Sequence, residues 1–172
     1  TGGAGNIGGS LARKLVKNEK NNILIVDNLL TGTKEKFPDI SYSNWRFINA
    51  DVNELNDLLE IFTSNSFDYV FHYAAVVGVK RTLENPNLVL GDVDGMKNIL
   101  EASKESSVKR VFFSSSSEVY GEPVEIPQTE YGTPLNSRLP YAIVKNISEA
   151  YLKSYKQMFD LDYTIFRFFN TY

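Results

Sequence analysis

Thr1-Gly2-Gly3-Ala4-Gly5-Asn6-Ile7-Gly8 opens the chain, and this stretch decides its fold. Gly2, Gly5 and Gly8 follow the spacing G-x-x-G-x-x-G, and Gly3, Gly5 and Gly8 follow G-x-G-x-x-G. Glycines at this spacing let a backbone turn approach a pyrophosphate closely and direct the N-terminus of a helix toward it. The stretch therefore predicts an α/β fold with a dinucleotide-binding turn.

The rest of the chain alternates strand-like and helix-like segments, which indicates a doubly wound, largely parallel sheet. Short apolar runs predict strands, and apolar residues at helical spacing predict amphipathic helices. The predicted strands are residues 23–26, 45–48, 69–71, 111–113 and 163–168, and the predicted helices are 7–16, 52–62, 141–159 and one that includes 96–103. Residues 28–43 and 121–138 are rich in glycine, proline and polar residues, so we expect loops there.

In a doubly wound sheet the glycine turn follows the first, central strand. No such strand stands before Thr1, and the sequence stops just after the predicted strand 163–168. We therefore expect residues 1–172 to be one Rossmann domain that lacks its first strand and the C-terminal substrate portion. The natural protein is expected to begin earlier and to continue beyond Tyr172.

Composition narrows the possible function classes. The 172 residues carry a net charge of −3, which argues against a general nucleic-acid binder. The chain has no cysteine and one histidine, so we do not expect a thiolate or histidine metal site. No apolar run approaches the length of a membrane-spanning helix, and no signal peptide is recognisable. We therefore expect a cytoplasmic protein without membrane, nucleic-acid or metal partners.

Two carboxylates follow the first two predicted strands. Asp27 comes about 20 residues after the glycines, where a dinucleotide fold places the carboxylate that binds the ribose hydroxyls. A carboxylate at this position repels a 2′-phosphate, so NAD is favoured over NADP as the cofactor. Asp51 and Val52 follow the next strand and have two interpretations: either they contact adenine, or Asp51 caps the helix 52–62.

Tyr141 and Lys145 lie four residues apart on the predicted helix 141–159 and therefore share a face. Pro140 directly precedes Tyr141 and suits a helix start. A lysine cation beside a phenol stabilises the phenolate and lowers its pKa. The pair thus makes Tyr141 a candidate base for removing a proton from a substrate hydroxyl.

A serine-rich segment, Ser114-Ser115-Ser116-Ser117-Glu118-Val119-Tyr120-Gly121, follows the predicted strand 111–113. Hydroxyl groups at the carboxyl edge of a parallel strand face the ligand crevice, where one of them can bind the reacting oxygen. Taken alone, the segment is better interpreted as a solvated polar turn. Glu118 is either a surface carboxylate or an acid or base near the substrate.

These features, in this order, resemble the extended short-chain dehydrogenase/reductase family, in its nucleotide-sugar epimerase/dehydratase branch. The resemblance rests on TGGAGNIGG, IVDNLLTG, ADV, HYAAVVG, FFSSSSEVYGEP, PYAIVK and FRFFNTY, which together span the whole chain. It implies a Rossmann fold, tightly held NAD and a nucleoside-diphosphate sugar as substrate, with a UDP-sugar as the first expectation. It also implies a homodimer built on paired helices.

The resemblance assigns cofactor contacts to individual residues. They are Gly2, Gly5, Asn6, Ile7 and Gly8 in the glycine turn, Asp27 and Asn28 at the adenosine ribose, Asp51 and Val52 at adenine, Ala74 and Ala75 along the cleft, and Lys145 at the nicotinamide ribose, beside Tyr141.

The catalytic residues implied by the resemblance are Ser116, the base Tyr141, and Lys145, which tunes the tyrosine. Ser116 also contacts the substrate, and Asn170 is expected at the diphosphate of the sugar nucleotide. Asp92 departs from the family pattern, in which asparagine is usual, so any role of that asparagine is in doubt here.

Members of this branch share a first step, the oxidation of the sugar at C4 to a 4-keto intermediate, and differ in the next one. An epimerase returns hydride to the other face, a 4,6-dehydratase removes water, and a UDP-glucuronate decarboxylase loses the C6 carboxylate. Glu118 favours the last two, and Ser117 before it is nearer to the decarboxylase pattern. The abundance of epimerases makes an epimerase the first expectation. A non-catalytic NAD-binding protein and a simple alcohol dehydrogenase that releases its cofactor are also compatible with these residues.

Overall fold

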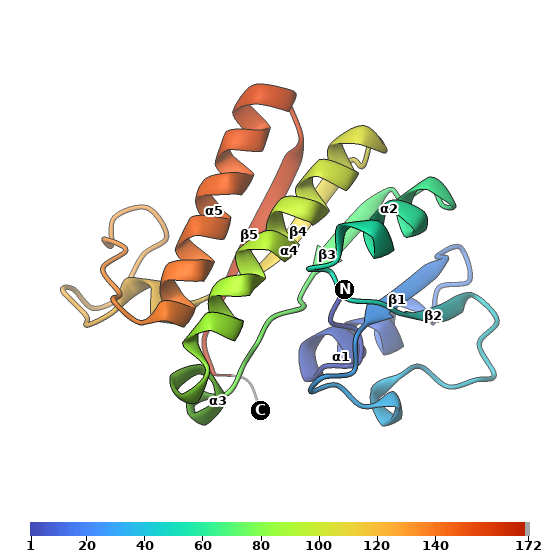
Figure 1. Ribbon diagram of the computed structural model, residues 1–172, viewed down its shortest axis with the longest axis horizontal. Helices are drawn as coiled ribbons and strands as arrows, with labels where there is room; N and C mark the ends of the chain where they lie inside the picture. Colours follow the sequence, from blue (N-terminus) through green and yellow to red (C-terminus); the bar gives the residue numbers. More distant parts are fainter. Residues whose placement is uncertain (171–172) are drawn as a thin grey trace.

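The computed structural model describes residues 1–170, apart from the side chains of residues 79 and 80. Its elements in chain order are α1 (Asn6–Leu15), β1 (Ile23–Asp27), η1 (Lys34–Lys36), β2 (Trp45–Asn49), α2 (Leu55–Thr63), β3 (Tyr69–His72), α3 (Val79–Glu84), α4 (Pro86–Glu105), β4 (Arg110–Ser116), η2 (Ser117–Tyr120), α5 (Pro140–Phe159) and β5 (Asp162–Phe168). Each predicted strand and helix is present, and the α/β alternation is confirmed (Figure 1).

The strands form two parallel ladders. β1 pairs with β2, while β4 lies between β3 and β5. The first residues of the chain lie between the ladders, because the Gly2 amide donates to the Val26 carbonyl at 2.9 Å and the Tyr73 amide donates to the Thr1 carbonyl at 3.2 Å. The opening residues thus connect β1 to the segment after β3, where a doubly wound sheet has its central strand.

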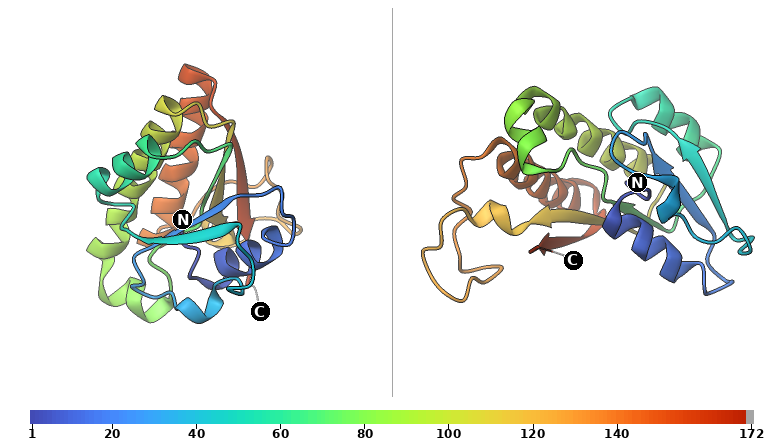
Figure 2. Two further views of the ribbon diagram at one scale, coloured as in Figure 1. Left: turned by 90° about the vertical axis from the view of Figure 1, so that its right-hand side faces the viewer. Right: turned by 90° about the horizontal axis from the view of Figure 1, so that it is seen from below.

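Helices cover both faces of the strands. α2, α4 and α5 lie on one face and α1 lies on the other, as the view from below shows (Figure 2). The main core lies between the strands and the three helices, and its most deeply buried side chains are Leu58, Met96, Ile99, Leu100, Val111, Phe113 and Leu152. Because strands of a parallel sheet are buried on both faces, the apolar run at 111–113 is continuous rather than alternating.

The helix predicted to include residues 96–103 is α4, which begins at Pro86, a residue type that suits a first helical turn. Two element boundaries differ clearly from the predictions. α2 begins at Leu55 rather than at residue 52. β4 continues through Ser116 because its serines pair with β5, up to the pair of Ser116 with Phe168.

Within the described part of the chain, no helix has the length and apolar character needed to cross a membrane. The described side chains also form no group of three or more His, Cys, Asp and Glu that could hold a metal ion.

Candidate functional site

The glycine turn packs directly against the segment that follows β3. Gly2 has a φ of 70°, in the region that favours glycine, and a Cβ at this position would lie 2.5 Å from the Ala74 nitrogen. A Cβ on Gly8 would lie 2.3 Å from the Gly2 carbonyl oxygen, and the Gly5 amide donates to that same oxygen at 3.1 Å. These contacts require glycine at residues 2 and 8, since only glycine allows backbone atoms to approach so closely.

The start of α1 has the properties of an anion-binding site. No side chain caps the helix at Gly5, and its first turn, which includes Asn6 and Ile7, contains no acidic residue. Amides at an uncapped helix N-terminus can donate to a phosphate, which the helix dipole also stabilises. The turn therefore fits the pyrophosphate of NAD.

Asp27 ends β1 beside the glycine turn. Its Oδ2 accepts a hydrogen bond from the Ala4 amide at 2.9 Å, and its Oδ1 accepts one from the Leu29 amide at 2.8 Å. The carboxylate therefore ties the turn to the loop after β1. Because a carboxylate has about four acceptor positions, Asp27 can also accept hydrogen bonds from ribose hydroxyls.

Asp51 lies at the carboxyl end of β2, next to the end of β1. The Asn28 side-chain amide donates to Asp51 Oδ2 at 2.8 Å, and the Asn53 amide donates to Asp51 Oδ1 at 2.9 Å. The interpretation of Asp51 as a helix cap is wrong, because α2 begins only at Leu55. Val52 is 9% exposed and belongs to the main core, so little of its surface is open to adenine, and that contact stays a prediction.

Ser116, Tyr141 and Lys145 come together where β4 ends and α5 begins. The Ser116 hydroxyl accepts a hydrogen bond from the Glu118 amide at 3.2 Å, and Ser116 is near enough to the Tyr141 phenol to act on its pKa. The Lys145 Nζ lies 5.6 Å from the centroid of the Tyr141 ring and 4.9 Å from that of Phe113. The structure thus groups the predicted trio, although the role of each residue stays a prediction.

Burial is the largest influence on the pKa values of Lys145 and Tyr141. It lowers the pKa of Lys145 to about 8, while the Asp92 carboxylate acts in the opposite direction. Burial also raises the pKa of Tyr141, with a smaller lowering by the neighbouring Ser116 hydroxyl and further raising by the charges of Asp92 and Glu118. The expected lowering of the Tyr141 pKa is therefore wrong for this chain, because desolvation of the phenolate outweighs the favourable contacts.

Asp92 lies on α4 and interacts electrostatically with Lys145. Its Oδ2 accepts a hydrogen bond from the Val76 amide at 2.7 Å, in the segment that contains Ala74 and Ala75. Burial raises the pKa of Asp92, whereas the Val76 amide and the charge of Lys145 lower it, and the charge of Asp51 raises it. The carboxylate therefore links the segment after β3 with Lys145.

Two predicted residues lie outside the buried part of the site. Glu118 is exposed in η2, and Asn170 is exposed after β5. Sequence reasoning missed a buried pair, Glu149 on α5 and Arg167 on β5, whose atoms are 2.7 Å apart. The available signal was a carboxylate four residues after Lys145, and therefore on the same face of the predicted helix.

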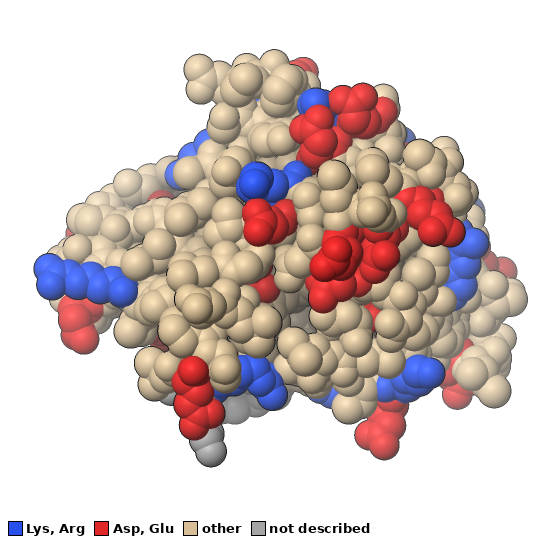
Figure 3. Space-filling view, viewed as in Figure 1, with Lys and Arg blue, Asp and Glu red and all other residues tan. Residues whose placement is uncertain are grey.

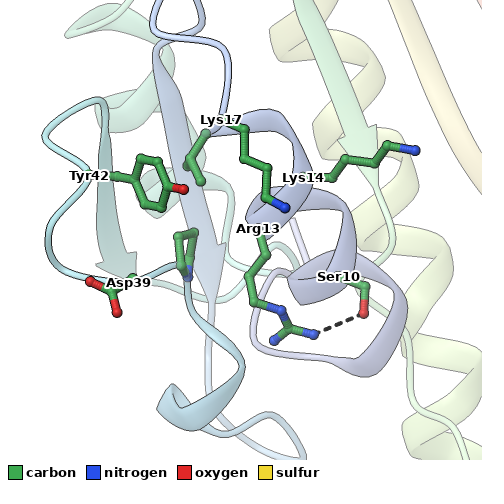
Figure 4. Close-up of a pocket in the computed structure, with 8 residues that line it drawn as sticks. Ser10, Arg13, Lys14, Lys17, Asp39 and Tyr42 are labelled. Atoms are coloured by element: carbon green, nitrogen blue, oxygen red, sulfur yellow. Dashed lines mark hydrogen bonds between the residues drawn. The ribbon is translucent and has the colours of Figure 1, made fainter.

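A hollow of about 500 Å³ lies between α1 and the segment around residues 38–42 (Figure 4). Its lining includes Arg13, Lys14, Lys17 and Tyr42, and the Arg13 guanidinium donates to the Ser10 hydroxyl at 3.0 Å. None of the predicted site residues lines this hollow, so it is not the candidate active site.

Comparisons with known proteins agree with this geometry. A putative UDP-glucose 4-epimerase of Methanocaldococcus jannaschii is 36% identical over 175 residues, which are 100% of this chain and 55% of that protein. A UDP-N-acetyl-α-D-glucosaminuronate decarboxylase of Bacillus cytotoxicus is 38% identical over 177 residues, covering 100% of this chain and 53% of that protein. The crystal structure of a UDP-glucose 4-epimerase from Brucella ovis in complex with NAD has a TM-score of 0.87 and 31% identity, and the match covers 98% of this chain and 50% of the other.

The chain spans about half the length of the curated relatives it matches. The Rossmann fold and the NAD dependence predicted from the glycine turn and Asp27 are confirmed at the level of the family. Since the family model matches residues 1–172 in full, the chain belongs to the NAD-dependent epimerase/dehydratase family.

Proposed function

We propose that the full-length protein is an NAD-dependent nucleotide-sugar epimerase and that residues 1–172 form its NAD-binding domain. The observation that carries the proposal is the grouping of Ser116, Tyr141 and Lys145 at the carboxyl edge of β4. The glycine turn reaches the same edge, because it packs on the segment that contains Ala74, and Asp92 bonds that segment at Val76.

In the proposed reaction, Tyr141 takes the proton of the C4 hydroxyl while Ser116 hydrogen-bonds the same oxygen. Lys145 is mostly protonated below its pKa of about 8, and its positive charge offsets the cost of forming the phenolate. NAD, when bound, supplies the acceptor for the C4 hydride. Once the 4-keto intermediate has turned its other face to the reduced cofactor, the hydride would return to C4 and Tyr141 would give the proton back to the C4 oxygen, so that NAD is regenerated.

The raised pKa of Tyr141 keeps the phenol protonated in the chain by itself. The positive charge of an oxidised nicotinamide lowers the pKa of a nearby phenol, as any close cation does. The site is therefore expected to remove a proton efficiently only when the oxidised cofactor is present.

The test is mass spectrometry and chromatography of the full-length protein incubated with UDP-, dTDP-, GDP- and CDP-sugars, including UDP-glucuronate. An epimerase yields a product of unchanged mass and shifted retention, and Tyr141→Phe abolishes it. A wild-type activity that survives Tyr141→Phe would refute the proposed base. Co-purification of stoichiometric NAD distinguishes the epimerase from a dehydrogenase that releases its cofactor, and the absence of any turnover supports a non-catalytic NAD-binding protein.

A decarboxylase is the second candidate function. It is supported by Glu118 after Ser117, and by the relative named as a decarboxylase. Loss of carbon dioxide from a uronic-acid nucleotide, abolished by Glu118→Gln, would establish it, and loss of water would indicate a 4,6-dehydratase. A product of unchanged mass, together with a fully active Glu118→Gln variant, would instead support the epimerase.

A homodimer is also proposed, on the face formed by α4 and α5. Leu88 and Leu90 on α4 are 43% and 45% exposed, and Ile143 and Ile147 on α5 are each 39% exposed. Much of the left half of this face, where α5 lies, carries no charge (Figure 3). Sedimentation of the full-length protein should show a dimer that Ile143→Asp disrupts. A cytoplasmic location stays a prediction, which cell fractionation tests.

A further inference from the structure

A buried ion pair lies directly behind the candidate site. The side chain of Glu149, on α5, is 0% exposed, and Arg167 lies opposite it on β5. Arg167 donates through Nε to Glu149 Oε1 at 2.9 Å and through Nη2 to Oε2 at 2.7 Å. Ser115 Oγ donates to the same Oε1 at 2.6 Å. The two-point contact fixes the direction as well as the distance of the carboxylate.

The third nitrogen of Arg167 connects the pair to the loop next to the site. Arg167 Nη1 donates to the Tyr120 hydroxyl at 3.0 Å and to the Glu130 carbonyl at 2.9 Å. Tyr120 is the last residue of η2, the turn that begins after Ser116, and Glu130 lies in the long segment between η2 and α5. The Arg167 guanidinium therefore connects four parts of the chain: its own strand β5, helix α5, the turn η2 and the segment between η2 and α5.

Three residues of this network lie close in the chain to a residue of the candidate site. Ser115 precedes Ser116, Tyr120 closes the turn that carries Glu118, and Glu149 follows Lys145 by one helical turn. We propose that the Glu149–Arg167 ion pair positions the reaction: it sets the place of Ser116 relative to Tyr141 and Lys145, and it fastens the loop through Glu130. This inference rests on the proposed function.

Stability alone is a poor explanation for the pair. Removing a carboxylate and a guanidinium from water is costly, and apolar residues of similar volume often pack at least as well. What an apolar pair lacks is a set of directed hydrogen bonds to Ser115, Tyr120 and the Glu130 carbonyl. Such directed bonds matter where a reacting group must be held accurately, because a misplacement of about 1 Å can cost about a hundredfold in rate.

The test is a double-mutant cycle in the full-length protein, made of Glu149→Gln, Ser116→Ala and both together. Glu149→Gln is expected to lower kcat by about 10- to 100-fold while KM for the sugar nucleotide stays within about threefold. In the Ser116→Ala background the same change should lower kcat by less than about twofold, because coupled residues do not act additively. Equal losses in both backgrounds would overturn the proposal.

Asp162→Asn is the matched control, because it removes an ion pair at the other end of β5, where Asp162 Oδ2 lies 3.0 Å from Arg110 Nη2. It should leave kcat unchanged. Ser115→Ala is a milder variant that keeps the ion pair and breaks only its bond to β4. It should lower kcat by several-fold, so that the proposal stays testable if Glu149→Gln does not fold.

A second readout does not depend on activity. Trypsin cleaves after Arg138, which lies in the segment that Arg167 fastens through Glu130. Glu149→Gln should speed cleavage at this bond, whereas Asp162→Asn should not. Unchanged cleavage in Glu149→Gln would overturn the part of the proposal that concerns the loop. If the wild-type protein turns over no sugar nucleotide, the proposed function fails, but the cleavage test still decides on the loop.

Discussion

Replacing Lys145 by methionine is expected to stabilise the protein while it abolishes the proposed reaction. Lys145 is 3% exposed, and burial lowers its pKa from the ordinary value of 10.5 to about 8. The difference between these two pKa values corresponds to about 3 kcal/mol of destabilisation by the charged form. Methionine fills the same space between the rings of Phe113 and Tyr141 without a charge.

Asp92 reduces this gain, because the charge of Lys145 favours the ionised carboxylate and the variant removes that charge. We therefore expect Lys145→Met to raise the free energy of unfolding at pH 7 by about 1–3 kcal/mol.

The pH dependence follows from the sign of the pKa shift. Since the folded-state pKa of Lys145 lies below the unfolded value, the unfolded chain binds more protons between about pH 8 and pH 10.5. The stability contributed at Lys145 therefore rises with pH through this window in the wild-type protein. Lys145→Met lacks the rise, so its advantage should be largest near pH 7 and should shrink as the pH approaches 10.

Urea unfolding of the NAD-free, full-length protein, followed by Trp45 fluorescence at pH 7 and pH 9.5, measures both effects. Lys156→Met is the matched control on the same helix, because Lys156 is bound by Asp160 and Asp162, and its pKa is raised rather than lowered. It should not stabilise the protein. A Lys145→Met variant less stable than the wild type at pH 7, or one with an unchanged pH slope, would refute the reasoning.

Two further predictions concern the cofactor turn and Asp92. Gly8→Ala should lower NAD affinity in calorimetric titrations by at least about tenfold, because its Cβ would lie 2.3 Å from the Gly2 carbonyl oxygen. Gly91→Ala is its control: nothing lies within 4 Å of that Cβ, so it should leave NAD affinity unchanged and stabilise α4 by about 0.5–1 kcal/mol. Asp92→Asn should move the alkaline limb of the pH–rate profile to lower pH, because it removes the carboxylate that raises the Lys145 pKa; an unmoved limb would contradict this.

Local patterns in the sequence were sufficient for the fold class and for most of the candidate site. The spacing of Gly2, Gly5 and Gly8, the strand-end position of Asp27, and the alternation of apolar segments depend on neighbours a few residues away. The spacing of Tyr141 and Lys145 is of the same kind, and the structure places both residues on α5 beside Ser116.

In two places the local sequence pattern did not predict the structure, because contacts between residues distant in the chain contribute there. Asp51 precedes a predicted helix and has the chemistry of a cap, yet α2 begins only at Leu55, and the Asp51 carboxylate also binds Asn28, 23 residues away in the chain. The sequence predicted a helix that includes residues 96–103 but left its start open, because Val89 is buried by residues remote in the chain, while Gly91 and Asp92 break the local apolar period.

The sequence by itself determined the α/β fold, the NAD-binding turn and the identity of the catalytic candidates, because these follow from residue types at short spacings. Only the tertiary structure decided the direction of the Tyr141 pKa, the link from Asp92 to Val76, and the ion pair of Glu149 with Arg167. Burial and long-range pairing depend on which elements pack together, and desolvation acts on a side chain only after that packing is complete.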